Sequence, residues 1–226
     1  MQKKLAWRQH TIQAAIFDMD GLMLDSERLA LDCWREAARH LGHPLHEEAI
    51  LGMVGMHVSR TRQWLLDQFG PDYPADAMRA RCHEIYLERT QNHPIPLRPG
   101  ILALLTWLEE LGIPKAVATS TQRQIALHHL GKSGLLPRFE FAVCGDEIAQ
   151  PKPAPDIYHL AAQRLGHAPP HCIVFEDSDF GVAAAHAAGC QVVMVPDLRA
   201  PSAHSRALDI TIVDSLDHAR ALLAKD

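Results

Sequence analysis

The stretch IFDMDGLMLDSE, residues 16–27, decides the fold of this protein. Apolar residues lead directly into Asp18 and Asp20, which are separated by one residue and followed by a glycine. A buried strand that ends in two carboxylates needs something to offset their repulsion, such as a cation, a shared proton or a divided catalytic role. A strand followed by an ordinary Asp-Gly turn is the simpler alternative, because both residues are common in turns. The residues that follow the other strands help to decide between these alternatives.

Short apolar segments rich in Val, Ile and Phe alternate with helix-period patterns along most of the chain. The expected strands are AAIFD (14–18), KAVAT (115–119), FAVCG (141–145), CIVFED (172–177) and QVVMVP (191–196). The expected helices between and after them cover 100–112, 122–134, 156–166 and 179–189. Continuous apolar segments of this length are typical of strands that are buried on both faces, as in a parallel sheet. The alternation predicts an α/β fold with a doubly wound, Rossmann-like parallel sheet.

Residues 26–93 differ from the rest of the chain, because they contain helix-period patterns and almost no strand-like segment. We expect them to form a helical cap domain inserted after the first strand. Residues 1–25 and 94–226 would then form the α/β catalytic core. The segment HPIPLRPG, residues 93–100, contains three prolines and suits a stiff linker or hinge between the two parts.

Composition and charge narrow the classes of partner. The chain has 226 residues, of which 47% are hydrophobic and 22% charged, as is usual for a globular protein with a proper core. Its formal net charge of -5 and pI of about 6.3 predict no attraction to nucleic acid or to anionic membranes. With no signal-like apolar start and no apolar run of about eighteen residues, we expect a cytoplasmic protein. The sequence is compatible with a monomer and does not decide the oligomeric state.

Cysteine and histidine spacing leaves one metal-site alternative open. The five cysteines are far apart and form no C-x-x-C pair, so we expect reduced, mostly buried thiols. His40, His43 and His46 recur at a spacing of three, which would suit a zinc site if they lay on one helix face. Gly42 and Pro44 interrupt any such helix, so we expect a solvated helix end and loop there instead.

Polar and charged residues follow the expected strands at their carboxyl ends, which is where open α/β sheets bind ligands. They are Asp18 and Asp20 after the first strand, Thr119, Ser120 and Thr121 after the second, Lys152 beyond the third, and Glu176, Asp177 and Ser178 after the fourth. Each group also has a separate structural explanation, as a helix cap or a solvated charge. Their convergence on one edge of the sheet favours a single site over several unrelated explanations.

The order of these motifs resembles the haloacid dehalogenase-like hydrolase superfamily: DMDG, then Thr119, then Lys152 in KPAPDIY, then FEDS. The helical insertion is similar to the small cap of its phosphatases and of β-phosphoglucomutase. The segments IFDMDGLMLDSERL, GIPKAVATST and AGCQVVMVPD resemble the subgroup that contains the pseudouridine-5'-phosphatases and the 2-deoxyglucose-6-phosphate phosphatases. The resemblance extends from about Ala14 to Val213. We do not expect a dehalogenase, because those enzymes lack the second aspartate, which is Asp20 here.

The resemblance implies a Mg²⁺-dependent phosphatase that hydrolyses a small phosphomonoester through an aspartyl-phosphate. Sugar, sugar-alcohol and nucleoside phosphates are the expected kinds of substrate. Asp18 would be the nucleophile, and Asp20 would protonate the leaving oxygen and later accept a proton from water. Thr119 and Lys152 would contact the transferring phosphoryl group, with Ser120 as a further phosphate-binding residue.

The same resemblance implies how the metal and the rest of the substrate are held. The expected Mg²⁺ ligands are Asp18, the backbone carbonyl of Asp20, Asp177 and Glu176. Glu27 at the entrance of the cap and His57 within it are the expected substrate contacts. The cap would act as a lid that excludes water from the site.

Two other functions remain as alternatives. Enzymes like β-phosphoglucomutase carry a histidine twelve residues after the nucleophile, linked to attack by a sugar hydroxyl, and this chain has Ala30 at that position. We therefore expect a phosphatase, with a phosphosugar mutase as the alternative. A binding module without catalysis would be expected to have lost some motif residues. The chain keeps Asp18, Asp20, Lys152 and Asp177.

Overall fold

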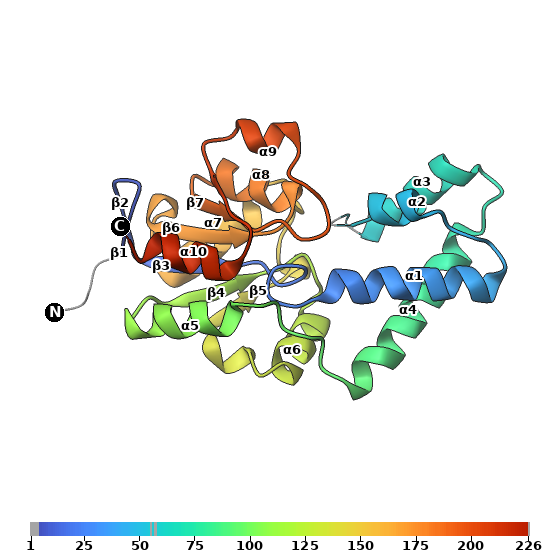
Figure 1. Cartoon of the computed structure of the whole chain (residues 1–226), viewed down its shortest axis with the longest axis horizontal. Coiled ribbons are helices and arrows are strands. Elements are labelled where there is room, and N and C mark those ends of the chain that lie inside the picture. Colours follow the sequence, from blue (N-terminus) through green and yellow to red (C-terminus); the bar gives the residue numbers. More distant parts are fainter. Residues whose placement is uncertain (1–4, 55, 57, 226) are drawn as a thin grey trace.

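The computed structural model describes residues 5–54, 56 and 58–225, so the expected contact at His57 lies outside the described residues. In this part of the chain, a parallel sheet of six strands carries helices on both faces (Figure 1). In sheet order, the strands are β5 (Phe141–Val143), β4 (Lys115–Ala118), β3 (Ala14–Phe17), β6 (Cys172–Glu176), β7 (Gln191–Met194) and β8 (Thr211–Ile212). This architecture confirms the predicted doubly wound α/β fold.

Successive residues of β3 point to opposite faces of the sheet, and each face packs against its own helices. The core helices are α5 (Ile101–Glu110), α6 (Arg123–Lys132), α7 (Asp156–Leu165), α8 (Asp179–Ala187), α9 (Ala203–Ala207) and α10 (Leu216–Leu223). Ala15 and Phe17 belong to the hydrophobic cluster that contains residues of α5, α6 and α10. Ala14 and Ile16 belong to the opposite cluster, which contains residues of α7 and α8. Because β3 is buried on both faces, its sequence is continuously apolar.

The strand order places a switch point at the centre of the sheet. From β3 the chain moves outward to β4 and β5, and then returns to β6 on the other side of β3. All of these neighbouring strands pair in parallel, and Phe17 of β3 lies opposite Phe175 of β6. The residues that follow β3 and β6 are therefore brought together at the crevice where sheets of this kind bind ligands.

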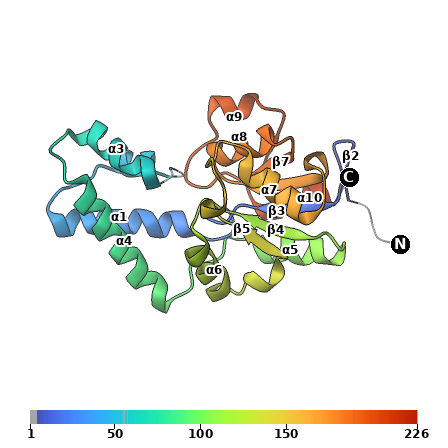
Figure 2. The same ribbon diagram turned by 180° about the vertical axis from the view of Figure 1, so that it is seen from behind.

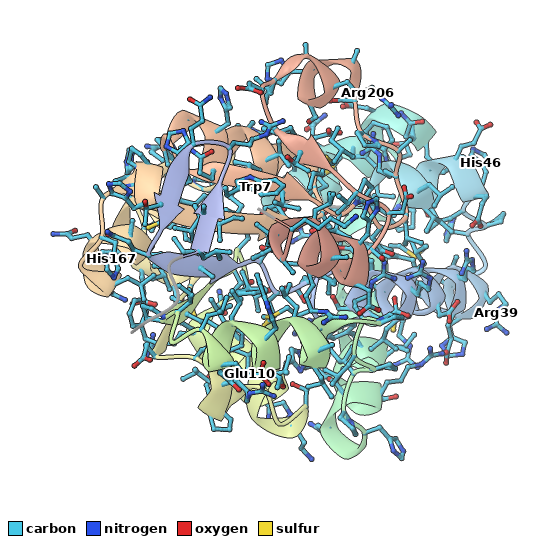
Figure 3. The ribbon with its side chains drawn as sticks, turned by 60° about the vertical axis from the view of Figure 1, so that its left-hand side comes forward. Trp7, Arg39, His46, Glu110, His167 and Arg206 are labelled. Atoms are coloured by element: carbon cyan, nitrogen blue, oxygen red, sulfur yellow. The ribbon has the colours of Figure 1, made fainter. Side chains whose placement is uncertain are left out.

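Several short elements lie outside the sequence-based prediction. They are β1 (Leu5–Trp7), β2 (His10–Ile12), β8, α2 (Glu47–Gly52), α9, α10 and short 3₁₀ helices at Leu136–Arg138, Gly145–Glu147 and Pro169–His171. The β1–β2 hairpin buries Trp7, labelled in Figure 3, in the same cluster as α10. β1, β2 and β8 have only two or three residues, too few to display a clear period. β5 is as short as β1 and β2, but it was expected because the apolar segment FAVC marks it.

In the described residues of the insertion that follows β3, the chain forms four helices. They are α1 (Ser26–Leu41), α2, α3 (Val58–Phe69) and α4 (Ala75–Asn92). Figures 1 and 2 place these helices beyond the carboxyl ends of the strands, with α1 packed along α4. They enclose a hydrophobic cluster of their own, which includes Leu31, Leu65 and Met78. The helical insertion after the first core strand agrees with the predicted fold, and the domain boundaries at 25/26 and 93/94 stay a proposal.

One carboxylate of the core holds both chain segments that connect it to the insertion. Oδ1 of Asp197, which follows β7, accepts hydrogen bonds from Arg28 at 2.9 Å and pairs with Arg98 at 2.8 Å. Arg28 lies in the first turn of α1 and also pairs with Asp25 at 2.6 Å. Arg98 belongs to the linker of residues 93–100, which leads from the insertion back to the core. The next residue, Leu198, packs against the hydrophobic cluster of the insertion. The core loop after β7 therefore anchors the insertion both where the chain enters it and where the chain leaves it.

The histidines that raised a zinc alternative have separate neighbours. The ring of His43 lies edge-on to Tyr73, and that of His46 lies against Phe69. His40 instead faces the guanidinium of Arg81. Figure 3 shows His46 on the outer surface of the insertion. All five cysteines are buried, as expected. Among the described helices, none is long and apolar enough to cross a membrane.

Candidate active site

Three carboxylates meet at the carboxyl ends of β3 and β6. Asp18 directly follows β3, and its N–H donates to the carbonyl of Phe175 at 3.0 Å. Glu176 is the last residue of β6 and Asp177 is the next. Because the two strands are parallel neighbours, Asp18 lies beside both acids, and one oxygen from each carboxylate falls within 4.8 Å of the others. The structure thus brings together three of the residues that were predicted from the sequence to belong to one site.

The glycine of the opening motif lets Asp177 approach the turn after β3. Gly21 has a φ of +80°, a left-handed conformation that favours glycine. A Cβ at this position would lie 2.2 Å from Oδ2 of Asp177 and 3.3 Å from Cγ of Glu27. The Gly21 N–H also donates to the Ser26 hydroxyl at 3.2 Å, at the start of α1. The Asp-Gly turn is therefore part of the site and not only a chain reversal.

Lys152 bridges the carboxylates of Asp18 and Glu176. Its Nζ donates to Asp18 Oδ1 at 2.5 Å, to Glu176 Oε1 at 2.6 Å and to the Ala118 carbonyl at 3.1 Å. The lysine side chain is only 6% exposed. Burial alone would lower the pKa of Lys152, but the charges of Asp18 and Glu176 outweigh it and raise the pKa. Lys152 is therefore a fixed cation against the predicted nucleophile.

Glu176 has protein partners on both of its carboxylate oxygens. Oε1 accepts from Lys152 and, at 2.7 Å, from the hydroxyl of the buried Tyr158. Oε2 accepts the N–H of Asp177 at 2.9 Å, and the N–H and the hydroxyl of Ser178 at 3.0 Å each. Burial opposes ionisation, yet Lys152 and these hydrogen bonds lower the pKa of Glu176. Its contacts are those of a group that orients Lys152.

The sequence placed Ser178 among the polar residues at the strand ends without giving it a role, and it did not single out Tyr158. Tyr158 is the tyrosine of KPAPDIY, three residues after a proline, where an apolar helix position gave no reason to expect a polar contact. Gly181 makes room for the carboxylate they hold, since a Cβ there would lie 1.6 Å from Glu176 Oε1. The Ser178 hydroxyl also accepts the Gly181 N–H at 3.1 Å and so caps α8.

Negative charge exceeds positive charge at these strand ends. Burial raises the pKa of Asp18, although Lys152 opposes the rise, and burial also raises the pKa of Asp177, with Glu176 adding to it. Beside Lys152 there are thus two further carboxylates whose ionised forms are poorly compensated. Their oxygen atoms are the ligands that hard divalent cations prefer. The donor set and its uncompensated charge fit a divalent cation bound by Asp18 and Asp177.

Asp20 is held by hydroxyls and not by a cation in the described part of the chain. Its Oδ2 accepts from the Thr121 hydroxyl at 2.7 Å and lies 3.4 Å from the Thr119 hydroxyl. Oγ1 of Thr119 also accepts the N–H of Thr121 at 3.1 Å. Ser120, which the sequence nominated, makes no side-chain hydrogen bond to a described residue. The structure brings Thr121 to Asp20, and Ser120 stays a prediction.

The insertion contributes the other side of the site. Glu27, in the first turn of α1, lies near enough for its charge to help raise the pKa of Asp177. From α3, Arg60 lies over the ring of Phe180, with its guanidinium carbon 5.6 Å from the ring centroid. A cavity of about 120 Å³ lies between the insertion and the core. It is lined by Val54, Asp177, Ser178, Asp179, Phe180, Met194, Asp197, Leu198 and Arg199.

This geometry can be compared with known proteins. The model of the haloacid dehalogenase-like hydrolase family matches residues 15–195. Fructose-1-phosphate phosphatase YqaB of Escherichia coli is 35% identical over 180 residues, which cover 80% of this chain and 94% of that protein. Hexitol phosphatase A of the same organism is 33% identical over 200 residues, 88% of each chain. The crystal structure of CbbY from Rhodobacter sphaeroides in complex with phosphate has a TM-score of 0.73 at 26% identity, and covers 91% of this chain and 95% of that one.

The sheet, its acidic switch point and these relatives define a phosphoric monoester hydrolase. The chain belongs to the haloacid dehalogenase-like hydrolase family, which confirms the resemblance carried by its motifs. The names of these relatives refer to different phosphorylated compounds. Family membership alone therefore does not identify the substrate of this chain.

Proposed function

We propose that this protein is a Mg²⁺-dependent phosphatase of a small phosphorylated sugar or sugar alcohol, acting through an aspartyl-phosphate on Asp18. The observation that carries the proposal is the buried contact between Lys152 and Asp18 at the switch point of the sheet, with Asp177 beside it. The names of the relatives, a fructose-1-phosphate phosphatase and a hexitol phosphatase, support this substrate class. Nucleoside phosphates are a second class to be tested.

In the first half of the reaction, a carboxylate oxygen of Asp18 attacks the phosphorus atom. The bond between phosphorus and the ester oxygen breaks, and Asp20 donates a proton to that departing oxygen. In the second half, water attacks the aspartyl-phosphate while Asp20 takes a proton from the water. Inorganic phosphate leaves and Asp18 is restored. Lys152 offsets the charge of Asp18 and of the phosphoryl oxygens in both halves.

We assign the Mg²⁺ ligands to Asp18, Asp177 and the backbone carbonyl of Asp20. When bound, the ion would neutralise phosphoryl charge and hold the group in line with Asp18. Glu176, the fourth ligand expected from the motif, is better assigned as the anchor of Lys152, because both of its oxygens already accept hydrogen bonds from the protein. Asp177 has no hydrogen bond from a described side chain and keeps its carboxylate for the metal.

A phosphatase accounts for the insertion better than a mutase does. A mutase of this family type would place a histidine at position 30, and the residue there is the half-buried Ala30 of α1. Alanine can neither accept a proton from a sugar hydroxyl nor hold that hydroxyl near the aspartyl-phosphate. Water, assisted by Asp20, is therefore the proposed acceptor. The intact contacts among Asp18, Lys152 and Glu176 likewise favour an enzyme over a binding module.

The protein as a whole suits a small anionic substrate. Its net charge of -5 supports the proposal that neither nucleic acid nor an anionic membrane is its partner. We also propose a cytoplasmic location, as expected from the sequence. The proposed substrate brings its own negative charge to a site of uncompensated carboxylates, which is why we propose that the metal is needed for binding as well as for chemistry.

A phosphate-release screen tests the proposed function. The panel contains fructose 1-phosphate, hexitol phosphates, 2-deoxyglucose 6-phosphate, glycerol phosphate, pseudouridine 5'-phosphate and β-glucose 1-phosphate, each assayed with Mg²⁺. We expect phosphate release from at least one sugar or sugar-alcohol phosphate, and no conversion of β-glucose 1-phosphate to the 6-phosphate. Asp18→Asn keeps the shape of the side chain and removes the nucleophile, so turnover should fall by about 10⁴-fold or more. Efficient isomerisation with negligible phosphate release would overturn the phosphatase assignment.

A further inference from the structure

We propose that Thr121 is a positioning residue for Asp20, whose hydroxyl holds the Asp20 carboxylate in the orientation that exchanges a proton with the substrate's leaving oxygen. The inference rests on the proposed phosphatase function, in which Asp20 is the general acid and base. It gives a role to a residue that the sequence placed at the same strand end as Thr119, two positions beyond it, without assigning it a function.

The contacts of Asp20 single out Thr121. The Thr121 hydroxyl donates to Asp20 Oδ2 at 2.7 Å, an ordinary short distance for such a bond, whereas the Thr119 hydroxyl lies 3.4 Å away, near the limit for one. Asp20 pairs with no lysine or arginine among the described residues. Asp18 has Lys152 to fix its position, but Asp20 depends on this hydroxyl.

The loop that carries Thr121 is held rigidly. The Thr121 N–H donates to Thr119 Oγ1 at 3.1 Å, and its carbonyl accepts the Gly145 N–H at 3.0 Å. Gly145 lies so close to this loop that a Cβ there would be 2.1 Å from the carbonyl oxygen of Ser120. A hydroxyl placed on such a support can fix a partner side chain, because little freedom remains to be lost when the contact forms.

The direction of the contact leaves the other carboxylate oxygen of Asp20 without a side-chain hydrogen bond from the described residues. Both threonine hydroxyls approach the same oxygen, Oδ2 of Asp20, so Oδ1 remains for proton exchange with the substrate and with water. A carboxylate without this contact could rotate away from the leaving oxygen. Misplacement of a reacting group by about 1 Å can lower a rate by roughly 10²-fold. Thr121 thus acts through Asp20 and needs no contact with the substrate.

Leaving-group dependence tests this role. Thr121→Val removes the hydroxyl at nearly constant shape, and Thr121→Ser retains it. We compare kcat/KM, which reports formation of the aspartyl-phosphate, for the best sugar phosphate of the screen and for p-nitrophenyl phosphate. A sugar alkoxide needs a proton to leave and nitrophenolate does not. Thr121→Val should therefore lower kcat/KM about 10- to 100-fold for the sugar phosphate and less than about threefold for p-nitrophenyl phosphate.

Further measurements separate positioning from other roles. Thr121→Ser should restore the sugar-phosphate rate to within about threefold of wild type, and the KM of Thr121→Val should change little. Thr106→Val, which removes a hydroxyl that accepts from Arg138 on the surface of α5, is the matched control and should keep the wild-type rate. Melting temperatures confirm that each variant folds.

Three outcomes would overturn the inference. Equal losses for both substrates would show that Thr121 binds the phosphoryl group directly. A sugar-phosphate rate for folded Thr121→Val within threefold of wild type would show that Asp20 does not need the hydroxyl. A wild-type protein that releases phosphate from neither substrate would overturn the proposed function itself, and the inference with it. A loss confined to the sugar phosphate, with rescue by serine, supports it.

Discussion

Lys152 and Asp18 are 134 residues apart in the sequence, yet Nζ of the lysine lies 2.5 Å from Oδ1 of the aspartate. The lysine side chain is 6% exposed and the aspartate side chain 10%, so the pair is almost fully removed from water. The same ammonium group lies 2.6 Å from Glu176 Oε1. One buried cation thus faces two carboxylates, and removal of the lysine leaves both of them without a cation.

Replacement of Lys152 should separate catalysis from stability. Lys152→Met should lower kcat by about 10³-fold, because the phosphoryl charge loses its fixed cation. It should also lower the free energy of unfolding by about 3 kcal/mol, because Asp18 and Glu176 then face each other without a cation between them. Steady-state phosphate release and urea denaturation measure the two effects.

Lys115→Met is the matched control for that prediction. Lys115 is also a buried lysine with a carboxylate partner, Glu109 at 3.3 Å, but it begins β4 and so lies at the end of the strand away from the site. We expect the control to lose stability while its kcat stays within about threefold of wild type. Similar kcat losses in both variants would contradict the role assigned to Lys152.

Metal binding should be measurable without an activity assay. A chelator should abolish phosphate release and Mg²⁺ should restore it. In addition, Mg²⁺ at about 100 times its Kd should stabilise the folded protein by about 2.7 kcal/mol, which raises the melting temperature. Asp177→Asn should remove this Mg²⁺-dependent rise. Asp179→Asn, two positions away, should keep it, because the Asp179 carboxylate is engaged with Ser202 and Ser205.

The two aspartate variants make this prediction specific. If Asp177→Asn and wild type respond equally to Mg²⁺, Asp177 is not a ligand. Full phosphatase activity of the wild type after exhaustive chelation would instead remove the metal from the mechanism altogether.

The Asp197 carboxylate should contribute measurably to the free energy of unfolding, although it lies in a loop. Its side chain is 1% exposed and it holds Arg28 and Arg98 at the two crossings to the insertion. Asp197→Asn should lower the free energy of unfolding by about 2 kcal/mol, a value reduced because both arginines can reach water. Asp209→Asn is the control, since its 95% exposed side chain pairs with Arg8 and should change stability by less than about 0.5 kcal/mol. Equal effects of the two substitutions in urea denaturation would refute the anchoring role.

His129 should make the fold sensitive to mild acid. Burial lowers the pKa of His129, with the negative charge of Asp20 opposing the shift and His128 adding to it, and Nε2 has no hydrogen-bond partner among the described residues. The unfolded chain binds a proton near pH 6.5, but the folded protein resists it until lower pH. The stability that depends on a neutral His129 is therefore present above about pH 6.5 and is lost as the pH falls through the folded pKa.

A comparison of neighbouring histidines tests that pH dependence. His129→Phe keeps an aromatic ring against Tyr86, which contacts the histidine edge-on, and removes the titrating group. Between pH 7.5 and 5.5 it should lose less stability than wild type does. His128→Phe alters the exposed neighbour on the same helix and keeps the buried ring, so it should follow the wild-type curve more closely than His129→Phe does. Parallel curves for wild type and His129→Phe would show that the folded protein does not lower the pKa of His129.

The sequence by itself determined the sheet, four of the core helices and the edge on which the site lies. Each expected strand is a continuous apolar segment, because a strand buried on both faces by helices must be apolar at every position. The strand ends then placed Asp18, Lys152 and Asp177 on a common edge, since parallel strands all point their carboxyl ends the same way. These inferences need only local periodicity and a rule of topology. β8, with two residues, is too short to display a period.

Only the tertiary structure decided which polar groups touch. The choice of Thr121 over Ser120 as the partner of Asp20 depends on how the loop after β4 is held against Gly145, and neighbouring hydroxyls look alike in the sequence. In the same way, Tyr158 and the Glu176 oxygens meet because α7 packs on the face of the sheet against β3 and β4, and nothing in the motif encodes that contact. The order of apolar and polar residues within each segment determines which of its faces is buried, independently of the other segments. Hydrogen-bond partners depend instead on the distances and directions between segments remote in the chain, which exist only once the fold has formed.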